Sequence, residues 1–494
     1  MAGLRNLTQA ELEILSEKGV DEFAEAVGLE RFHELWFQSY SYEGTASCLE
    51  CHGEEAADVL QMGHFKWAGK IVNIEGLEGE VHGKKDLVNN FCVAVGSNEP
   101  RCTQCHIGYG YKDDSFDFSN PENIDCLVCH DQTGTYQKGK TSAGMPDPSV
   151  DLDFVAQNIA FNGGEPTRKA CIGCHAKAGG GDNVKHGDIS TDLIATTREF
   201  DVHMGVDGGD MVCVDCHASK VDPDTGKVVH GIPGMALHSV DEGDMQQCED
   251  CHTDRAAIHA NLVDPALMES GWHDRLACQV CHIPAIARAI STKTEWYWAD
   301  AGMNVDPIPI DETTGRPTYD KKKGSFVWKN DVRPVLRYAN GTWRRKVIGV
   351  NDQYDQTPVD LGSPVGSFYD DDAMIYPFKL MVGNQPADVH TQSMLVPHLF
   401  GTGPGPNPFW GRFDWHSALE EGAAYNGQDY SGGYEFVDTT MLLSVNHEIA
   451  PAEDALGQGM GGCVDCHMPG TIDWEALGWT ANPISGGARV PPSD

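Results

Sequence analysis

The sequence has few basic residues for its length. Lys and Arg together number 35, against 74 Asp and Glu, so 494 residues carry a formal net charge of −39. A surface this acidic is repelled by nucleic acid and by anionic membranes. It favours contact with a protein partner that carries a basic patch. We therefore expect no nucleic-acid ligand and a positively charged docking partner.

Long apolar runs are also missing. No stretch reaches the roughly 20 apolar residues that a membrane-spanning helix needs, so we expect no membrane span. The hydrophobic fraction of 40% still allows a sizeable core. The opening residues MAGLRNLTQAELEIL have neither the charged region nor the apolar region of an export signal.

Cysteine outside a repeated motif is nearly absent. Of 17 cysteines, sixteen lie in eight C-x-x-C-H units, and Cys92 alone lies outside them. The eight units are Cys48, Cys51 and His52; Cys102, Cys105 and His106; Cys126, Cys129 and His130; Cys171, Cys174 and His175; Cys213, Cys216 and His217; Cys248, Cys251 and His252; Cys278, Cys281 and His282; and Cys463, Cys466 and His467.

This spacing is typical of covalent heme attachment. Two thiols three residues apart form thioethers with the two vinyl groups of one heme, and the adjacent His reaches the iron as an axial ligand. Zinc half-sites and disulfide staples are the alternatives, but a His follows every pair. We predict eight heme c groups. Because heme c is attached outside the cytoplasm, we expect a periplasmic or extracellular protein and a chain given in its processed form.

The remaining histidines can supply the second axial ligands. Thirteen lie outside the motifs, which is enough for two histidines at every iron. From their positions near the motifs we select eight as distal ligands: His64, His186, His203, His238, His259, His273, His398 and His447. We do not select the other five, which are His33, His82, His230, His390 and His416.

Four consecutive segments are expected along the chain. Residues 1–44 form helices capped by Thr8 and Asp21, and residues 45–290 form a core with seven motifs. Residues 291–450 carry no motif, but the Asn340–Gly341 pair predicts a β-hairpin over 331–350. Residues 451–494 hold the eighth motif and a tail. The predicted fold is mainly α with extensive loops, and it comprises a compact heme-packed core and a small insertion containing the hairpin.

Two further features each allow a structural and a functional interpretation. Cys92 lies ten residues before the second motif; composition alone favours a buried apolar thiol, and a reactive thiol near a heme is the alternative. The run GGGDNVKHGD places Asp182 and Lys185 beside His186. Lys185 is an ordinary solvated lysine in one reading. In the other, burial and coordination lower its pKa so that it binds iron.

The chain resembles the octaheme tetrathionate reductase family of multiheme cytochromes c. The resemblance is carried by the run NNFCVAVGSNEPRCTQCHIGYG, by DNVKHGD and by the order of the eight motifs, and it extends from about residue 45 to 470. It implies that the heme on Cys102 and Cys105 is catalytic, that Lys185 is its ligand, and that His106 does not bind iron. It also implies that Asn89, Cys92 and Asp182 line the substrate pocket.

The expected activity is a respiratory reductase of anaerobic metabolism. Low-spin hemes would pass electrons to the one open heme, where a small inorganic substrate such as tetrathionate, nitrite or hydroxylamine is reduced. A Cys92 thiolate can attack the central S–S bond of tetrathionate, and an anionic substrate requires a local basic funnel. The redox partner would be another cytochrome or a quinol dehydrogenase. The sequence leaves the oligomeric state unassigned.

Two other functions remain open at this stage. The first is an octaheme enzyme that converts nitrite or hydroxylamine. Octaheme nitrite reductases typically use a C-x-x-C-K motif, which this chain lacks, and the tyrosine cross-link of hydroxylamine oxidoreductases cannot be identified here. The second is an electron conduit without a substrate. Only the Cys92 and Asp182–Lys185 features, together with the resemblance, argue against it.

Overall fold

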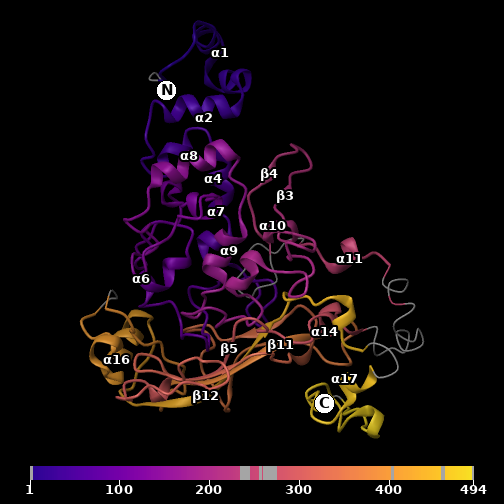
Figure 1. The fold of residues 1–494 in the computed structure, drawn as a ribbon. Coiled ribbons are helices and arrows are strands. Elements are labelled where there is room, and N and C mark those ends of the chain that lie inside the picture. Colours follow the sequence, from indigo (N-terminus) through magenta and orange to yellow (C-terminus); the bar gives the residue numbers. More distant parts are fainter. Residues whose placement is uncertain are drawn as a thin grey trace. The chain divides into compact units, whose positions relative to one another are not determined.

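The computed structural model describes most of the chain (Figure 1). The described residues are 4–233, 245–254, 259, 275–401, 405–457 and 462–491. None of the helices within these ranges has both the length and the apolar character needed to cross a bilayer.

The chain forms two compact units, and each combines segments that are far apart in sequence. The first unit comprises Met1–Lys66, Pro100–Cys171 and Ser219–Gly231, and the second comprises Trp67–Glu99, Ile172–Ala218 and Ile232–Asp494. The four consecutive segments expected from the sequence follow chain order, whereas the chain passes repeatedly between these two units.

The first unit begins with a long capped helix. Helix α1 (Gln9–Val27) starts at Thr8, whose hydroxyl accepts from the Glu11 N–H at 3.2 Å while the Glu11 carboxylate accepts from the Thr8 N–H at 2.6 Å. The predicted Thr8 cap is confirmed. The predicted helix start at Asp21 is wrong, because α1 continues to Val27 and the break comes at Gly28, whose φ of +86° favours glycine.

The rest of the first unit is short helices joined by loops. Helix α2 (Leu29–Phe37) packs against α8 (Leu152–Asn162), with the rings of Phe37 and Phe161 6.0 Å apart. The smaller elements are α3 (Ala46–Leu49), α4 (Gly53–Val59), α5 (Gly63–Lys66), α6 (Glu99–Cys102), η1 (Thr103–Cys105), η2 (Pro121–Asn123), α7 (Leu127–His130), α9 (Arg168–His175) and the strand pair β3 (Lys220–Val221) and β4 (Val228–Val229).

The second unit is built on an eight-stranded sheet. Its main path has the order β6-β7-β5-β11-β12-β10-β9, and β8 pairs with β11 off this path. The strands are β5 (Thr292–Tyr297), β6 (Tyr319–Asp320), β7 (Gly324–Lys329), β8 (Val335–Ala339), β9 (Trp343–Arg345), β10 (Val359–Pro364), β11 (Met374–Asp388) and β12 (Tyr434–Ser444).

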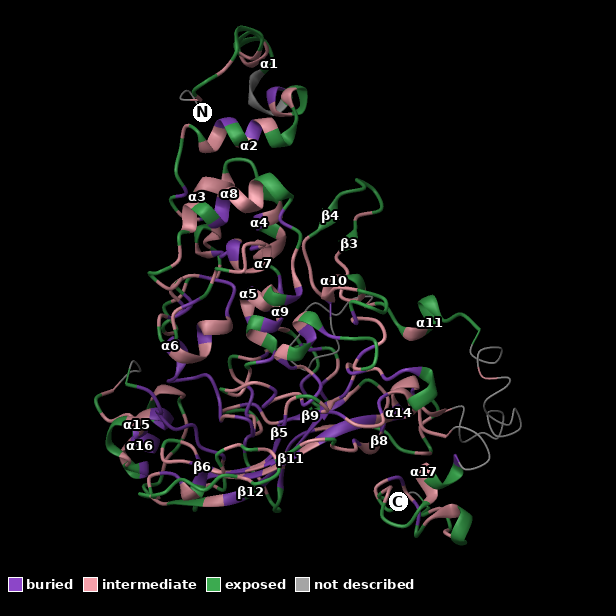
Figure 2. Ribbon diagram, viewed as in Figure 1, coloured by how far each residue is buried: buried purple, intermediate pink, exposed green. Residues whose placement is uncertain are grey.

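Strand β11 is the centre of this sheet. It pairs antiparallel with β12 over the eleven positions from Phe378 to Asp388, and it pairs in parallel with β5. Most of its residues are buried, which the purple ribbon of Figure 2 shows. Strands buried on both faces carry near-continuous apolar runs rather than a clean alternation. The side chains of β11 are therefore in a position to hold loops that pack on the sheet.

Two sequence predictions about this unit are wrong. The fold is not mainly α, because the segment without heme motifs supplies a large mixed sheet. The predicted hairpin over 331–350 does not form either: β8 and β9 flank the Asn340–Gly341 turn, but β8 pairs with β11 and β9 pairs with β10. Each strand finds its partner in a distant segment, which a local turn signal does not report.

Short elements surround the sheet. They are β1 (Gly69–Lys70), β2 (Val81–His82), η3 (Thr191–Ala195), α10 (Cys213–Cys216), α11 (Cys248–Cys251), α14 (Cys278–His282), η5 (Trp298–Asp300), α15 (Phe409–Arg412), α16 (Trp415–Tyr425), η6 (Ala452–Asp454), α17 (Cys463–His467) and η7 (Pro483–Ser485). Four of the eight heme motifs, on α10, α11, α14 and α17, lie entirely within these elements and the residue that follows each.

The pairing of β5 with β11 depends on Gly383. A Cβ atom added there would collide with the carbonyl oxygen of Trp296 on the neighbouring strand. We expect Gly383→Ala to lower the free energy of unfolding by about 1–3 kcal/mol through overpacking. Gly53→Ala is the control, because nothing lies within 4 Å of its added Cβ. Equal denaturant midpoints for the two variants would contradict the packing described here.

Candidate functional site

Most C-x-x-C-H units are folded as an α-helical turn, whereas the second motif passes from α6 into the 3-10 helix η1. Examples are α7, which ends at His130, and α14, which spans Cys278–His282. On a helix, residues three apart lie on the same face. Both cysteine sulfurs of a motif therefore point to the same side, as attachment to the two vinyl groups of one porphyrin requires.

Among the described residues, five motif histidines face a second histidine from elsewhere in the chain. In each pair the ring centroids are 6.1–6.5 Å apart. The pairs are His52 with His33, His130 with His230, His217 with His447, His252 with His203, and His282 with His259.

This separation matches two imidazoles on one metal ion. A metal–imidazole bond is about 2 Å long, so rings bound on opposite sides of one ion have centroids about 6 Å apart. The residues present therefore fit low-spin heme iron held between two histidines.

Second contacts orient these rings for coordination. The Nδ1 atom of His130 bonds to the Gly164 carbonyl at 2.6 Å, and that of His217 bonds to the Pro233 carbonyl at 2.7 Å. His447 bonds through Nδ1 to Asp188 at 3.2 Å. A hydrogen bond at one ring nitrogen leaves the other to bind a metal and fixes its direction.

The predicted distal ligands have mixed outcomes. His203, His259 and His447 face motif histidines, although His447 faces the fifth motif rather than the eighth, which follows it in the chain. His238 and His273 lie outside the described residues. His64 lies on α5, where its carbonyl accepts from the Ile107 N–H at 3.5 Å.

His398 is not placed as a heme ligand. It is fully buried, its Nδ1 bonds to Glu421 at 2.8 Å, and its Nε2 bonds to the Phe400 carbonyl. Both ring nitrogens are engaged by the protein, so the prediction for His398 is wrong. The prediction was made from the number and sequence positions of the histidines, which do not report the local hydrogen-bond partners of His398.

His33 and His230 are the partners that the sequence did not identify. His33 lies on α2, in a helix with no motif, and His230 follows the short strand β4. Nothing in the neighbouring residues marks either one as a ligand. Each is brought to its motif by packing within the first unit, which has no local sequence signal.

His186 lies in the turn after α9 and is poised to be neutral. Burial holds its pKa well below the usual range, and Lys185, followed by His175 of the fourth motif, lowers it further. A histidine must be neutral to bind a metal.

His106 of the second motif is arranged differently from the other motif histidines. Its Nε2 donates to the carbonyl oxygen of Phe65, and its side chain is fully buried. Three aromatic rings enclose it, with centroids at 5.3 Å for Phe65, 5.1 Å for Tyr111 and 5.3 Å for Phe116. The nitrogen that would face iron is bonded to the backbone instead.

The loop that carries Asn89 and Cys92 is held from the sheet. The Asn89 Oδ1 accepts from the Cys92 N–H at 2.9 Å, which closes the loop on itself. The Gln385 amide of β11 donates to the Asn89 carbonyl, and the Trp298 indole donates to the Cys92 carbonyl at 2.9 Å. The backbone on both sides of the thiol is thus fixed by the second unit.

The turn that carries Asp182 and Lys185 is also held from the sheet. The fully buried Lys379 of β11 donates to the carbonyls of Val184 at 2.6 Å and Lys185 at 2.9 Å, and to the Thr292 hydroxyl at 2.7 Å. Burial lowers the pKa of Lys379 to about 7, while three acceptors match the three donors of its ammonium form. Lys379 therefore places positive charge beneath this turn.

The Asp182 carboxylate anchors the turn. Its carboxylate accepts from the Thr191 N–H at 3.0 Å and from the Thr191 hydroxyl. Within the same turn, the Asn183 amide donates to the carbonyls of Gly187 at 3.0 Å and Ile290 at 2.6 Å. These bonds fix the backbone from which Lys185 projects.

Cys92 and Lys185 are brought to one place in the second unit. The Lys185 ammonium lies 5.2 Å from the ring centroid of Phe91, the residue next to Cys92. A Cβ atom added at Gly179 would lie 3.0 Å from the Phe91 carbonyl, so the glycine-rich turn packs directly on this loop. The second unit contains Asn89, Cys92, Asp182 and Lys185, whereas the first unit contains Cys102, Cys105 and His106.

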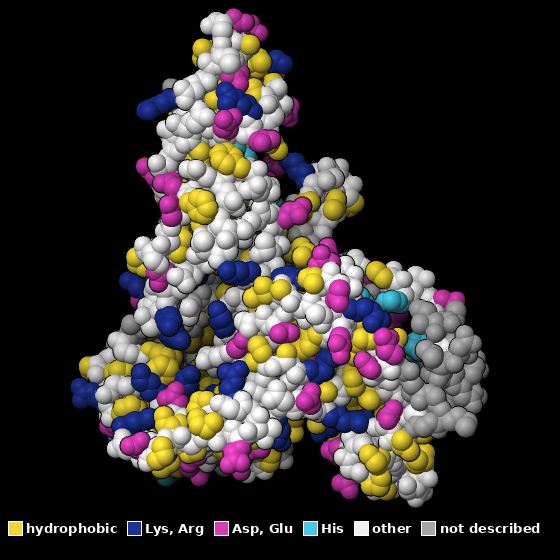
Figure 3. Space-filling model, in the orientation of Figure 1, with side chains coloured by type: hydrophobic (Ala, Val, Ile, Leu, Met, Phe, Trp, Pro, Cys, Tyr) yellow, Lys and Arg dark blue, Asp and Glu magenta, His cyan; other side chains and the backbone are white. Residues whose placement is uncertain are grey.

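Another lysine-rich element lies beside this loop and turn. The turn between β6 and β7 carries Lys321, Lys322 and Lys323, and the Lys323 ammonium lies 3.4 Å from the Gly180 carbonyl. On the face shown in Figure 3, Lys and Arg side chains gather over the part of the second unit that contains β5, β6 and α16. This local excess of positive charge occurs in a strongly acidic chain.

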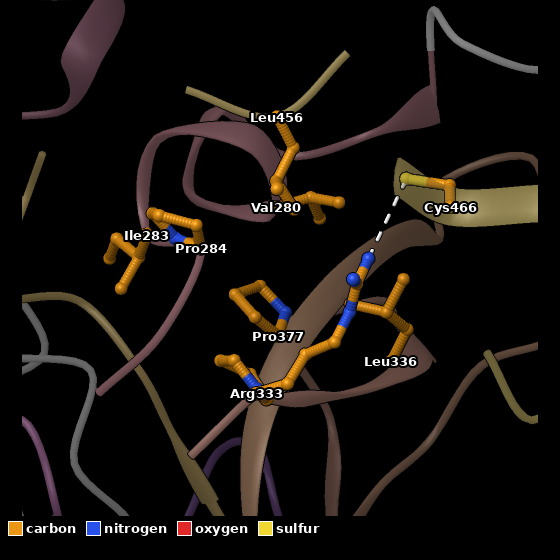
Figure 4. Close-up of a pocket in the computed structure, with 9 residues that line it drawn as sticks. Val280, Ile283, Pro284, Arg333, Leu336, Pro377, Leu456 and Cys466 are labelled. Atoms are coloured by element: carbon orange, nitrogen blue, oxygen red, sulfur yellow. Dashed lines mark hydrogen bonds between the residues drawn. The ribbon is translucent and has the colours of Figure 1, made fainter. Parts of the chain in front are cut away.

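An apolar pocket is lined by residues of both the seventh and the eighth motif (Figure 4). Its walls are formed by Val280, Ile283, Pro284, Leu336, Pro377 and Leu456. Arg333 reaches across it to the sulfur of Cys466, at 3.9 Å.

The sixth and seventh motifs lie next to each other. The sulfur of Cys248, a carboxylate oxygen of Glu249 and the sulfur of Cys278 all lie within 4.8 Å of one another. Each sulfur belongs to a different C-x-x-C-H unit, so both are committed to heme attachment. The two attachment points are close enough for their hemes to be neighbours.

Comparison with known proteins agrees with this geometry. A family model described as bacterial cytochrome c matches residues 293–470, and one described as cytochrome c554 and c-prime matches residues 47–131. The crystal structure of octaheme cytochrome c from Shewanella oneidensis is similar, with a TM-score of 0.77 and 37% sequence identity. The match covers 90% of this chain and 94% of that one.

The chain belongs to the octaheme cytochromes c. An uncharacterised protein of Archaeoglobus fulgidus is also similar, at 26% identity, over 36% of this chain and 74% of that protein. The octaheme cytochrome is thus a multiheme c-type electron-transfer protein with heme c as its cofactor. The count of eight follows from its eight motifs and from the octaheme relative.

The facing pairs predict which histidine substitutions change heme ligation. In the oxidised octaheme cytochrome, His33→Gln should convert one low-spin heme to high spin, because the iron bound by His52 loses its second imidazole. His398→Gln is the matched control and should leave the spin count unchanged. Quantified EPR spectra of the two variants decide this. The opposite pattern would contradict the ligand assignment made from ring geometry.

Proposed function

We propose that this octaheme cytochrome is a periplasmic reductase of small oxidised sulfur anions of the tetrathionate type. The observation that carries the proposal is the joint placement of Cys92 and Lys185. Two side chains of one strand, Gln385 and Lys379 of β11, hold the backbone of both segments. A chain that only passed electrons would need neither a thiol nor a lysine held in this way.

The roles of the residues follow from the family resemblance and from simple chemistry. Lys185 would bind the iron of the heme attached to Cys102 and Cys105, in place of His106. That heme would supply electrons and one exchangeable position when bound. His106, whose Nε2 is bonded to the Phe65 carbonyl, leaves the ligand position to lysine. Asn89 and Asp182 would hold the loop and the turn.

The surroundings of Cys92 favour an anionic substrate. The Lys185 ammonium lies 5.2 Å from the ring of Phe91, and Lys323 lies beside Gly180, although the whole chain has a net charge of −39. A cluster of one sign raises the local concentration of oppositely charged ligands. Tetrathionate and nitrite are anions, whereas hydroxylamine is neutral, so the lysines favour the first two.

Nitrite is the second candidate that these lysines support. It can bind at an open iron without a thiol, so the reaction of tetrathionate requires Cys92 and that of nitrite does not.

The redox partner would dock through a basic patch, because the acidic chain repels acidic partners. A cytochrome or a quinol dehydrogenase with such a patch fits this requirement.

Substitution of Cys92 tests the proposed substrate class. We expect Cys92→Ala to lower kcat for tetrathionate by at least about 1,000-fold, because loss of a nucleophile removes the covalent step. Hydroxylamine turnover by the same variant, and its heme spectrum, serve as internal controls and should be nearly unchanged.

Two results would count against the proposal. Unchanged tetrathionate turnover in Cys92→Ala would remove the thiol from the reaction and favour nitrite. No turnover of tetrathionate, nitrite or hydroxylamine by the wild-type protein with a strong reductant would favour an electron conduit.

A further inference from the structure

Helices α1 and α2 carry a concentration of negative charge. Residues 9–37 contain eight acidic and two basic residues, which gives a net charge of −6 in this short segment, against −39 for all 494 residues. Arg31 is already paired, with Glu11 at 2.9 Å and with Glu34 at 2.7 Å. Lys18 is the remaining cation of the two helices. The segment therefore has a charge density more than twice that of the whole chain.

Most of this charge faces solvent. Within the described part of the chain, the exposed carboxylates of α1 and α2 that lie outside the Arg31 pairs have no ion-pair partner. Like charges three or four residues apart on a helix repel one another, so these side chains weaken α1 unless a cation offsets them. These carboxylates belong to Glu13, Glu17, Glu22, Glu25 and Glu30.

Two exposed apolar side chains adjoin the carboxylates in sequence. Leu12 on α1 is 46% exposed and Leu29 on α2 is 69% exposed. The apolar side chains that join the two helices are buried by contrast, and they are Phe23, Phe32 and Leu35. Apolar side chains surrounded by charged ones are the usual composition of a protein–protein interface.

The two helices are large enough for a transient interface. Helix α1 has 19 residues, so it is about 28 Å long and about 10 Å across. It lies on the side of α2 away from α8 (Figure 1). Weak electron-transfer complexes bury less than about 1,200 Å² in total, or about 600 Å² on each partner. The exposed sides of α1 and α2 together suit an interface of this class.

The same helix pair reaches the first heme motif. His33 on α2 faces His52, with ring centroids 6.3 Å apart and planes 20° apart. Glu30 lies one turn before His33 on this helix. Electron transfer between proteins requires the partner to bind close to a heme, because its rate falls steeply with distance. A protein bound on α2 is next to the helix that supplies this ligand.

We propose that the exposed sides of α1 and α2 form the docking surface for a small basic c-type cytochrome, which delivers electrons to the heme on Cys48 and Cys51. In each transfer the ferrous iron of the carrier is oxidised and one ferric heme of this chain is reduced, with no proton or group transferred. The inference goes beyond the proposed function, because it concerns the entry of electrons and holds for any substrate.

Charge separates this surface from the proposed substrate site. Helices α1 and α2 belong to the first unit, whereas Lys185 and Lys323 belong to the second. An acidic surface attracts basic proteins and repels small anions, and a lysine cluster does the opposite. A basic carrier and an anionic substrate are therefore drawn to different units of the chain.

Cross-linking of the holoprotein locates the surface. The probe is oxidised mitochondrial cytochrome c, a small basic protein, and a carbodiimide joins carboxylates directly to its lysines. We expect the cross-linked peptides to contain carboxylates of residues 9–37. Cross-links confined to other carboxylates would overturn the inference. Cross-links from residues 9–37 to a second copy of this chain, with none to the probe, would also overturn it, because the occupant would then be another copy.

Electron-transfer rates test whether the surface is used. The reduced holoprotein is mixed with oxidised cytochrome c, because the same encounter serves both directions of transfer. At about 0.1 M salt, charges more than about 10 Å from the contact are largely screened. We expect the double variant Glu17→Lys, Glu25→Lys to lower the second-order rate constant at least about tenfold.

A second double variant controls for net charge. Glu312→Lys, Glu420→Lys changes two exposed carboxylates of the second unit and raises the net charge by the same amount. Its rate constant should stay within about twofold of wild type, and both variants should keep the heme spectrum and melting temperature. Equal rate constants for the two variants would sink the inference. Neither measurement uses tetrathionate, so this inference and the proposed function can fail separately.

Discussion

The structure depends on one constraint, the placement of a second imidazole about 6 Å from a motif histidine, as in the five facing pairs among the described residues. A C-x-x-C-H turn can form locally, but it presents only one ligand to the iron. The second ligand has to be brought from elsewhere, as His447 is brought to His217 and His230 to His130. Much of the short helical and loop structure is organised around such pairs. Flat cofactors bound between facing imidazoles fill space that side chains fill in other proteins of this size.

A second constraint acts at the thiol and the lysine. Two loops without regular structure cannot hold reactive groups in place by themselves, because loops are mobile unless their backbone is tied down. Here β11 supplies the fixed points: Lys379 holds the turn with Lys185, and Gln385 holds the loop with Cys92. The sheet therefore holds the residues of the proposed pocket in place, as the facing histidines would hold the hemes. Its role is to position groups that act elsewhere.

The attachment sites could be predicted from the sequence because their spacing is set by the porphyrin itself. The cap at Thr8 could be predicted for a similar reason, since the capping residues are local. The distal partners could not. Sequence position selected His398 and not His33, yet packing places His33 opposite His52 and surrounds His398 with Glu421 and a carbonyl.

The large sheet was missed for a related reason. Its strands lie in a segment rich in Trp, Tyr and Pro, and the central strand β11 pairs with β5, β8 and β12 from separate parts of that segment. The turn pair Asn340–Gly341 correctly marked the end of one strand and the start of another, but it did not reveal that the two join different neighbours.

The central claim is that one heme differs from the other seven and is ligated by Lys185. The most direct measurement is a spin-quantified EPR spectrum of the fully oxidised holoprotein beside that of Lys185→Met. The account predicts one high-spin or exchangeable ferric heme in eight in the wild-type protein, and a change in that signal alone in the variant. Eight low-spin hemes in the wild-type protein, or a spectrum that Lys185→Met leaves unchanged, would contradict it.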